Sequence, residues 1–333
     1  MKTGDKMSFR NQKNSAIVLA TAIMVAAFLV SLFTGKYHIS FSQILNPEST
    51  SSLVFLNLRL GRTLMACIAG ASLALAGHIF QIIFRNPLAS PDITGVASGA
   101  GTGAAAAILL FGYNGIVTSF SAFLGGMISV ALVLFLAKFV KSGGTVKLLL
   151  SGIVVNSISE AVLMMVKLCS DTDQKLSSIE FWLMGSFASI TIDKISAVIC
   201  FVLAGFMGIL VMNKKIILLS LPDDEAEMLG VNVKTIRVLS IIAATLITSA
   251  VVSVTGLISF IGLLAPHISK HIISEGNPKC IVLTAIIGMN LMLISDIIAR
   301  SLLVSEIPIS VITSLIGAPV LFILLFKRGE MNG

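Results

Sequence analysis

The chain has 333 residues, of which 56% are hydrophobic and only 12% are charged, and its mean hydropathy is +1.00. Soluble domains carry about 25% charged residues, so this composition excludes a soluble globular protein and indicates a polytopic membrane protein. The net charge of +7 would suggest nucleic-acid binding in a soluble protein. Cytoplasmic loops of membrane proteins carry excess Lys and Arg, however, and we expect no nucleic-acid partner and a lipid bilayer instead.

The predicted spans follow one another along the chain, and most have about the 20 residues that a transmembrane helix needs. In the first half they cover residues 16–34, 61–84, 93–111, 116–139 and 148–168. We expect the more polar residues 35–58 and 169–190 to lie along the outer surface. Gly95, Gly99 and Gly103 recur every four residues, a spacing that lets helix backbones approach closely in lipid, and we interpret them as packing residues.

The second half is predicted to contain the spans 191–212, 238–254, 260–273, 280–299 and 307–326, which makes about ten in all. Pro266 interrupts the short span at 260–273. With both termini in the cytoplasm, 16 of the 23 Lys and Arg residues fall on the cytoplasmic side, as the positive-inside rule expects. The predicted fold class is therefore all-α and polytopic, with one transmembrane domain over residues 1–333.

The densest charge lies between the sixth and seventh spans, at residues 213–237. Pro222 and the acidic residues after it are typical of a helix start, and Gly230 is typical of a helix end. We predict that Asp223 or Asp224 caps this short helix. The positive count places the segment in the cytoplasm, and we interpret it as the element on which a soluble partner acts. Its candidate coupling residues are Asp223, Asp224, Glu225, Glu227, Leu229 and Gly230.

Three arginines break the inside bias, because Arg59 and Arg62 flank the start of span 61–84 and Arg300 follows span 280–299. Long arginine side chains at helix ends reach lipid headgroups, and arginine also makes directional ion pairs with carboxylates of a partner protein. The residues alone leave both interpretations open. Asp296 lies four residues before Arg300 and is expected to pair with it.

The span at 148–168 carries a polar stripe. Gly152, Asn156, Ser159 and Glu160 fall near one helical face. A carboxylate inside a span usually faces a water-filled cavity or a protein partner, so the stripe suits either a conduit or a buried helix contact.

Nothing in the sequence points to an enzyme. It contains no phosphate-binding Gly-x4-Gly-Lys-Ser/Thr loop, and no His or Cys cluster has metal-ligand spacing. His78 and His267 lie in apolar runs and are interpreted as packed side chains. We therefore expect no catalytic residue, no metal and no cofactor in this chain.

Several blocks occur in order across nearly the whole chain. They include Arg59-Leu-Gly-Arg62, Arg85-Asn-Pro-Leu-Ala-Ser-Pro-Asp92, Leu148-Leu-Leu-Ser-Gly152, Asp224-Glu-Ala-Glu-Met-Leu-Gly-Val231, Phe260-Ile-Gly-Leu-Leu-Ala-Pro-His267 and Ile316-Gly-Ala-Pro319. These blocks resemble the FecCD family, the permease subunits of type II ABC importers for iron-siderophore complexes, haem and cobalamin. The resemblance is specific for the family and weak for the substrate.

The resemblance implies the type II ABC importer permease fold in the cytoplasmic (inner) membrane, with a second permease subunit, expected to be an identical copy. It implies two separate ABC ATPase subunits, which bind ATP and magnesium, and a periplasmic or lipid-anchored substrate-binding protein. Residues 222–230 match the coupling helix of the family. The docking positions for the binding protein match Arg59, Arg62 and Arg300, and the pore-lining helix with its gate matches span 148–168 with Gly143, Gly144, Thr145 and Val146.

The resulting prediction is a permease that moves an iron(III)-siderophore complex into the cell by ATP-driven alternating access. Haem and cobalamin are the alternative cargoes. A rival from another class is an ion-coupled secondary transporter, which needs several carboxylates or broken-helix ion sites at the membrane midplane. Apart from Glu160 the spans are nearly free of carboxylates, which argues against that rival.

Overall fold

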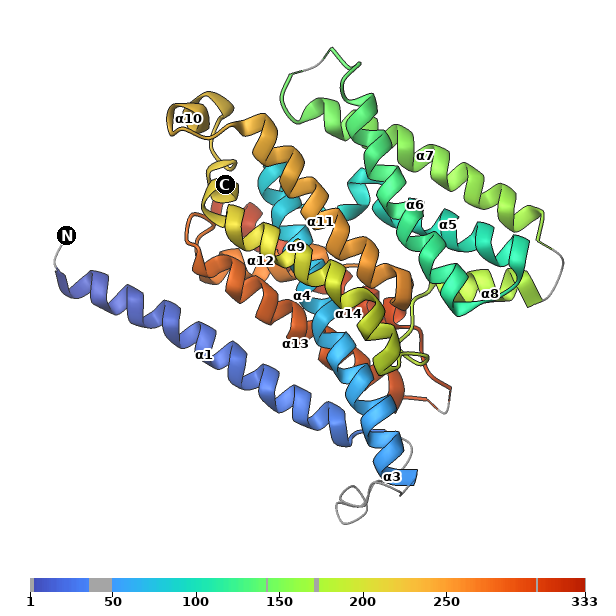
Figure 1. The fold of residues 1–333 in the computed structure, drawn as a ribbon. Helices are drawn as coiled ribbons and strands as arrows, with labels where there is room; N and C mark the ends of the chain where they lie inside the picture. Colours follow the sequence, from blue (N-terminus) through green and yellow to red (C-terminus); the bar gives the residue numbers. More distant parts are fainter. Residues whose placement is uncertain (1–2, 36–49, 142, 171–173, 304, 333) are drawn as a thin grey trace.

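A computed structural model describes residues 3–35, 50–141, 143–170, 174–303 and 305–332, and the regular secondary structure in these ranges is helical (Figure 1). The helices at the predicted spans are α1 (Thr3–Phe33), α4 (Gly61–Phe84), α5 (Val96–Phe111), α6 (Gly115–Leu136), α7 (Val146–Leu168), α9 (Ile192–Leu218), α11 (Val233–Thr255), α12 (Ile261–Ile272), α13 (Lys279–Ser301) and α14 (Ile309–Asn332). Shorter elements are α3 (Thr50–Leu53), the π-helix η1 (Val54–Leu60), the 3-10 helix η2 (Pro91–Thr94), α8 (Gln174–Leu183) and α10 (Asp223–Met228). Of the predicted surface segments, residues 36–49 and 171–173 lie outside the described ranges.

Within the described residues, 7 helical segments are long and apolar enough to cross a membrane. Helix α5 has 16 residues and α12 has 12, which is short of the length that a full crossing needs. The all-helical, polytopic prediction is confirmed, and the count of about ten spans stays a prediction.

Three predicted boundaries are wrong, each for a local reason. The third span does not begin at residue 93, because Gly95 adopts a left-handed conformation (φ 73°) that separates η2 from α5. Pro266 does not interrupt the eighth span but lies inside the continuous helix α12. The spans 191–212 and 238–254 are each too short on the polar side, because the polar residues 213–218 continue α9 and α11 begins at Val233; the short helix predicted between Pro222 and Gly230 is present as α10.

Helix α4 lies at the centre of the fold and contacts α9, α11, α12 and α13. In α4, α11 and α13, 78%, 72% and 61% of the apolar segment is buried, compared with 17% in α1 and in α7. Most side chains of α1 and α7 are therefore accessible in the single chain, whereas α4, α11 and α13 form the protein core.

Small residues bring the central helices close together. A Cβ atom on Gly70 would overlap the backbone of Gly288 in α13, and one on Gly77 would overlap the carbonyl of Gly262 in α12. Such close backbone contacts replace the hydrophobic driving force that is missing between helices in lipid. In the same way Gly99 of α5 faces Gly125 of α6, so its predicted packing role is confirmed.

The two ends of the helical body carry different elements. Figure 1 shows α10 and the connection between α6 and α7 at one end, and α3 at the opposite end. The predicted coupling and gate residues thus lie at one end of the molecule, and the predicted docking residues next to α3 lie at the other.

Candidate functional site

Helix α10 is fixed to the membrane helices by one carboxylate. Asp223 Oδ1 accepts hydrogen bonds from Arg85 Nη2 at 2.6 Å and from Arg237 Nη2 at 2.9 Å. Arg85 is the residue that follows α4, with a left-handed backbone (φ 48°), and Arg237 lies in the first turns of α11. We call these three side chains the Asp223 clamp. It ties the start of α10 to both α4 and α11.

The clamp keeps Asp223 ionised. Partial burial raises the pKa of this carboxyl, but the hydrogen bonds and charges of Arg237 and Arg85 outweigh burial and hold its pKa below the ordinary value. The prediction that Asp223 or Asp224 caps the helix is wrong, because Pro222 takes the N-cap position and no side chain bonds there. The carboxylate of Asp223 binds Arg85 and Arg237 instead.

Apart from Ala226, which is buried in the core, the residues of α10 after Asp223 are exposed. Asp224, Glu225 and Glu227 are exposed, as are Met228 (87%) and Leu229 (60%). An apolar pair next to three carboxylates on a protruding helix is a surface that suits docking onto another protein. Whether these side chains contact an ATPase stays a prediction.

Gly230 ends α10, as its position in the sequence predicts. Its backbone is left-handed (φ 82°), and its N–H donates to the carbonyl of Glu227 at 2.9 Å. The N–H of Val231 donates to the carbonyl of Ala226 at 3.1 Å, which completes a glycine-terminated helix end.

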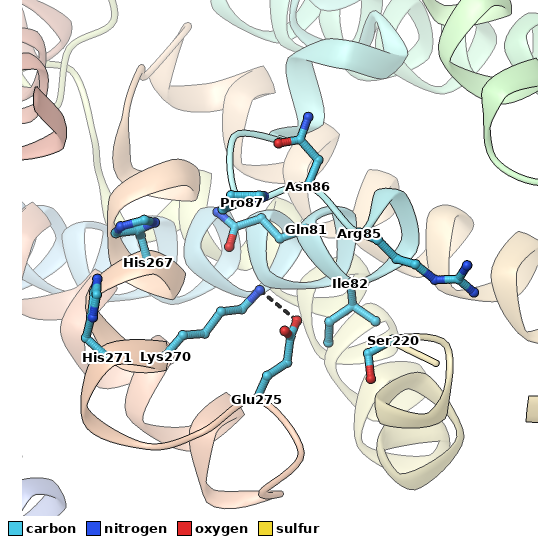
Figure 2. Close-up of a pocket in the computed structure, with 10 residues that line it drawn as sticks. All are labelled: Gln81, Ile82, Arg85, Asn86, Pro87, Ser220, His267, Lys270, His271 and Glu275. Carbon is cyan, nitrogen blue, oxygen red and sulfur yellow. Dashed lines mark ion pairs between the residues drawn. The ribbon is translucent and has the colours of Figure 1, made fainter. Parts of the chain in front are cut away.

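A pocket of about 250 Å³ opens beside the clamp, between the end of α4 and α12 (Figure 2). It is lined by Gln81, Ile82, Arg85, Asn86, Pro87, Ser220, His267, Lys270, His271 and Glu275. Lys270 Nζ pairs with Glu275 Oε1 at 2.7 Å, and Figure 2 shows the Arg85 side chain pointing away from this pair. Its Nη2 binds Asp223 instead. In the described part of the chain, no group of three or more His, Cys, Asp or Glu side chains is arranged to hold a metal ion.

At the opposite end, the predicted docking arginines surround a buried carboxylate. Asp296 is 0% exposed and accepts a hydrogen bond from Arg62 Nε at 2.8 Å, while Arg300 Nη2 lies 3.3 Å from its other oxygen. The predicted pairing of Asp296 with Arg300 is confirmed, although Arg62 is the nearer partner. Arg62 Nη1 also donates to both carboxylate oxygens of Glu306, each at 2.9 Å.

Arg59 and Arg300 hold the end of α1. Arg59 Nη1 donates to the carbonyls of Leu32 and Phe33, and Arg300 donates to the carbonyls of Ser31 and Thr34, at 2.8–3.2 Å. Cations suit the C-terminus of a helix, where carbonyls lack partners. These two side chains bind the backbone at the end of α1, so they neither extend to the lipid headgroups nor project from the surface.

The arginines nevertheless remain in reach of a partner. Arg59, Arg62, Arg300 and Glu306 together line a pocket of about 250 Å³, with Gly35 at its rim. Docking of a binding protein at this pocket stays a prediction, and within the chain Asp296 and Glu306 already pair with two of these arginines.

The polar stripe of α7 divides into two parts. Gly152 is buried, where a Cβ atom would overlap the carbonyl of Ile93, and the carbonyl of Ser159 accepts a hydrogen bond from Thr102 at 2.9 Å. These two residues hold α7 against η2 and α5. Asn156 and Glu160 face a cavity instead, and Asn156 Nδ2 donates to Glu160 Oε1 at 2.9 Å.

This cavity, which we call the central cavity, has a volume of about 420 Å³ and lies between η2, α7, α11 and the start of α12. Its lining includes Ser90, Asp92, Ser98, Asn156, Glu160, Thr248, Ser259 and Phe260, with apolar residues between them. The sequence pointed to Asn156 and Glu160 but not to Asp92, because residues 85–92 served only as one of the blocks that resemble the family.

The predicted gate turn precedes α7. Gly143, Gly144 and Val146 are exposed, Thr145 is partly exposed, and Gly144 has a left-handed backbone (φ 62°). Among the described residues, no atom lies within 4 Å of a Cβ atom built on either glycine. The turn is free of close neighbours in the single chain, and its role as a gate stays a prediction.

Comparison with known proteins decides the family. The FecCD transport family matches residues 23–327. The chain belongs to this family. It is therefore a transport permease and not an enzyme, as the sequence predicted.

The FecCD match is supported by relatives along the whole chain. The molybdate import system permease protein of Haemophilus influenzae is 37% identical over 94% of this chain and 96% of its own length. The Fe(3+)-citrate import system permease protein of Bacillus subtilis is 34% identical over 96% and 98%. Permeases named for hemin in Yersinia pestis and for cobalamin in Halobacterium salinarum are 30% and 33% identical, over 98% and 85% of this chain and 100% and 75% of their own lengths.

A solved structure agrees with the fold. A metal-chelate type ABC transporter in an inward-facing conformation superposes with a TM-score of 0.87 at 35% identity, over 94% of this chain and 99% of that one. This FecCD chain is a membrane-embedded, polytopic permease whose relatives carry chemically diverse cargoes.

Proposed function

We propose that this chain forms the transmembrane part of an ATP-driven importer for an iron(III)-siderophore complex, with about ten spans, one permease domain and both termini in the cytoplasm. Two copies of the chain line the path. Two ABC ATPase subunits bind ATP and magnesium beneath α10, this chain holds no cofactor of its own, and a substrate-binding protein docks at the opposite end. Haem and cobalamin are the alternative cargoes, in keeping with the names of two relatives.

The main observation that supports this proposal is the way in which α10 is attached to the membrane helices. A helix whose first carboxylate is clamped to Arg85 and Arg237, and whose remaining acidic and apolar side chains are exposed, transmits force better than a flexible loop. Motion of an attached ATPase passes through the clamp to α4 and α11, the most buried helices. These helices border the central cavity, so the ATPase cycle changes which side the cavity faces.

The test is uptake into vesicles that contain the permease, its ATPase subunits and its binding protein. We expect uptake of an iron(III)-siderophore to require ATP hydrolysis, and Glu225→Ala with Glu227→Ala to leave assembly intact but reduce uptake per ATP. Uptake by the permease alone under an ion gradient, without an ATPase, would instead establish the secondary-transporter rival.

A further inference from the structure

We propose that the central cavity is a charge filter that admits neutral and cationic chelates and disfavours anionic ones. The inference rests on the proposed transport function and names the chemical class of its cargo.

The charged groups of the central cavity have one sign. Asp92 from η2 and Glu160 from α7 both line it, and no Lys, Arg or His is present among the described residues of its wall. Both residues line the cavity and have solvent-accessible surface in the single chain. The charged side chains that the described residues contribute to this cavity are therefore both acidic.

Neither carboxylate forms an ion pair with a basic side chain among the described residues. Asp92 Oδ2 accepts a hydrogen bond from Ser90 at 3.2 Å, and Glu160 Oε1 accepts one from Asn156 at 2.9 Å, so both donors are uncharged. The carboxylates at the two ends of the molecule differ, since Asp223, Asp296 and Glu306 each pair with arginine. These three carboxylates have arginine partners, whereas the two in the central cavity have uncharged hydrogen-bond donors.

The positions of these carboxylates are fixed by backbone contacts. Gly152 of α7 lies against the carbonyl of Ile93, next to Asp92, and Thr102 binds the carbonyl of Ser159, next to Glu160. Ser129 also donates to the carbonyl of Gly95 at 2.7 Å. Asp92 and Glu160 therefore lie on backbone segments that are packed against neighbouring helices.

Fixed negative charge next to a low-dielectric wall repels anions strongly, because the interaction of two charges grows as the dielectric constant falls. Molybdate and iron(III)-citrate are anionic, so the central cavity disfavours the cargoes named for two of the most similar relatives. Three hydroxamate groups neutralise iron(III), and such a complex offers polar atoms to Ser98, Asn156 and Ser259. A neutral or cationic hydroxamate-type chelate is the cargo that fits this wall.

A reporter cysteine measures the charge directly in the complex of the permease with its ATPase subunits. The reporter is Ser98→Cys, or Ala97→Cys as a second site, in a chain that carries Cys67→Ala, Cys169→Ser, Cys200→Ala and Cys280→Ala. Its reaction rates with a cationic and an anionic methanethiosulfonate reagent are normalised to a free thiol. We expect the normalised rate with the cationic reagent to be roughly ten times the rate with the anionic one. This rate ratio should fall towards one when Asp92→Asn and Glu160→Gln are added.

The control is a chain that retains Cys169 alone, since this exposed thiol lies at the end of α7 outside the central cavity. A reporter ratio equal to the control ratio at both sites, or one unchanged by the two neutralising substitutions, would overturn the inference.

The second arm tests the cargo. The binding protein and vesicles with the full complex are given a neutral and a cationic iron(III) trihydroxamate, iron(III)-citrate and molybdate. We expect ATP-dependent uptake of a trihydroxamate only, and ATP-dependent uptake of citrate or molybdate would overturn the charge filter. If uptake of every probe were independent of ATP, the proposed function would fail, and the reporter ratio would still show whether the cavity charge is as stated.

Discussion

Arg85 and Asp223 form an ion pair of 2.6 Å that joins the end of α4 to the start of α10. Arg85 is also the residue before Asn86, at the beginning of the segment that carries Asp92 to the central cavity. The contact therefore lies between α10 and the segment that forms part of the wall of the central cavity. It offers a direct mechanical route from α10 to the cavity, and the following prediction tests it.

Replacing the Asp223 carboxylate, which Arg85 and Arg237 share, should lower the stability of the protein only slightly but should strongly reduce cargo uptake per ATP. Asp223 is one-third exposed, and such ion pairs contribute about 0.2–1 kcal/mol each, so Asp223→Asn should lower the unfolding free energy by roughly 1 kcal/mol. Because α10 then loses its link to α4 and α11, we expect ATP hydrolysis to continue while cargo uptake per ATP falls severalfold. The measurement is hydrolysis and uptake in the same vesicles.

A matched control exists at the same end of the molecule. Glu275→Gln removes the Lys270–Glu275 pair, which has a similar length (2.7 Å) and a similarly exposed carboxylate but no contact with α10. An equal loss of uptake in both variants would contradict a specific role for the Asp223 clamp.

Acid should weaken the clamp in a defined pH range. The pKa of Asp223 is lower in the folded chain than its ordinary value of 3.8. Its stabilising contribution is therefore fully present above about pH 4 and is lost as the pH falls through the lower, folded pKa. We expect the difference in melting temperature between the wild type and Asp223→Asn to be constant from pH 7 to 5 and to shrink below pH 4. A difference that shrinks already between pH 7 and 5 would assign the clamp's pH dependence to another group.

Removal of Arg62 should cost more, because its partner is buried. Arg62→Ala leaves Asp296, which is 0% exposed, with only the longer contact to Arg300. Leaving a buried charge without its partner typically costs about 3–5 kcal/mol. We expect a large drop in melting temperature, a smaller one for Arg62→Lys, and partial recovery when Asp296→Asn is added to Arg62→Ala. Additive losses in the double variant would show that the two side chains are not coupled.

Much of the fold is readable from the sequence where the signals are local. Span 61–84 was predicted with the bounds of α4, because an apolar run there ends at Arg85-Asn86-Pro87. Helix α10 was predicted from Pro222 and Gly230, which act on their own turn. The Asp223 clamp was not predictable, since Arg85 and Asp223 lie 138 residues apart and Asp224 is an equally good sequence candidate. Only the packed orientation of α10 selects between the two acids.

The same limit applies to the outer arginines and to the central cavity. Their positions at helix ends were visible in the sequence, but burial around Asp296 depends on how α1, α4 and α13 meet. Asp92 enters the cavity because Gly95 turns the chain with a left-handed backbone after η2. The sequence shows that residue 95 is a glycine, but it does not show that the turn at Gly95 directs the Asp92 carboxylate into the cavity.

Glu306 should compete with a docking partner for Arg62. Its carboxylate is bound by Arg62 Nη1 at 2.9 Å and lines the same pocket as Arg59 and Arg300. If a carboxylate of the binding protein enters this pocket, Glu306→Gln removes an internal charged competitor and should tighten docking about threefold, with a slower dissociation rate. Glu180→Gln, which breaks the Lys167–Glu180 pair at 2.9 Å outside this pocket, is the control. Unchanged docking of both variants would argue that the arginine pocket only holds α1.

The crossing of α4 and α12 should tolerate no added methyl group. A Cβ atom on Gly77 would overlap the backbone carbonyl of Gly262, and backbone atoms cannot move aside as a flexible side chain does. We expect Gly77→Ala to push α12 away from α4 and to destabilise the protein by about 1–3 kcal/mol, as overpacking does. Gly115→Ala at the start of α6, where a Cβ atom meets nothing within 4 Å among the described residues, should leave the melting temperature unchanged. Because α12 begins at the central cavity and carries Lys270 beside the Asp223 clamp, Gly77→Ala should also reduce uptake in folded complexes. Full uptake at normal melting temperature would contradict this view of the crossing.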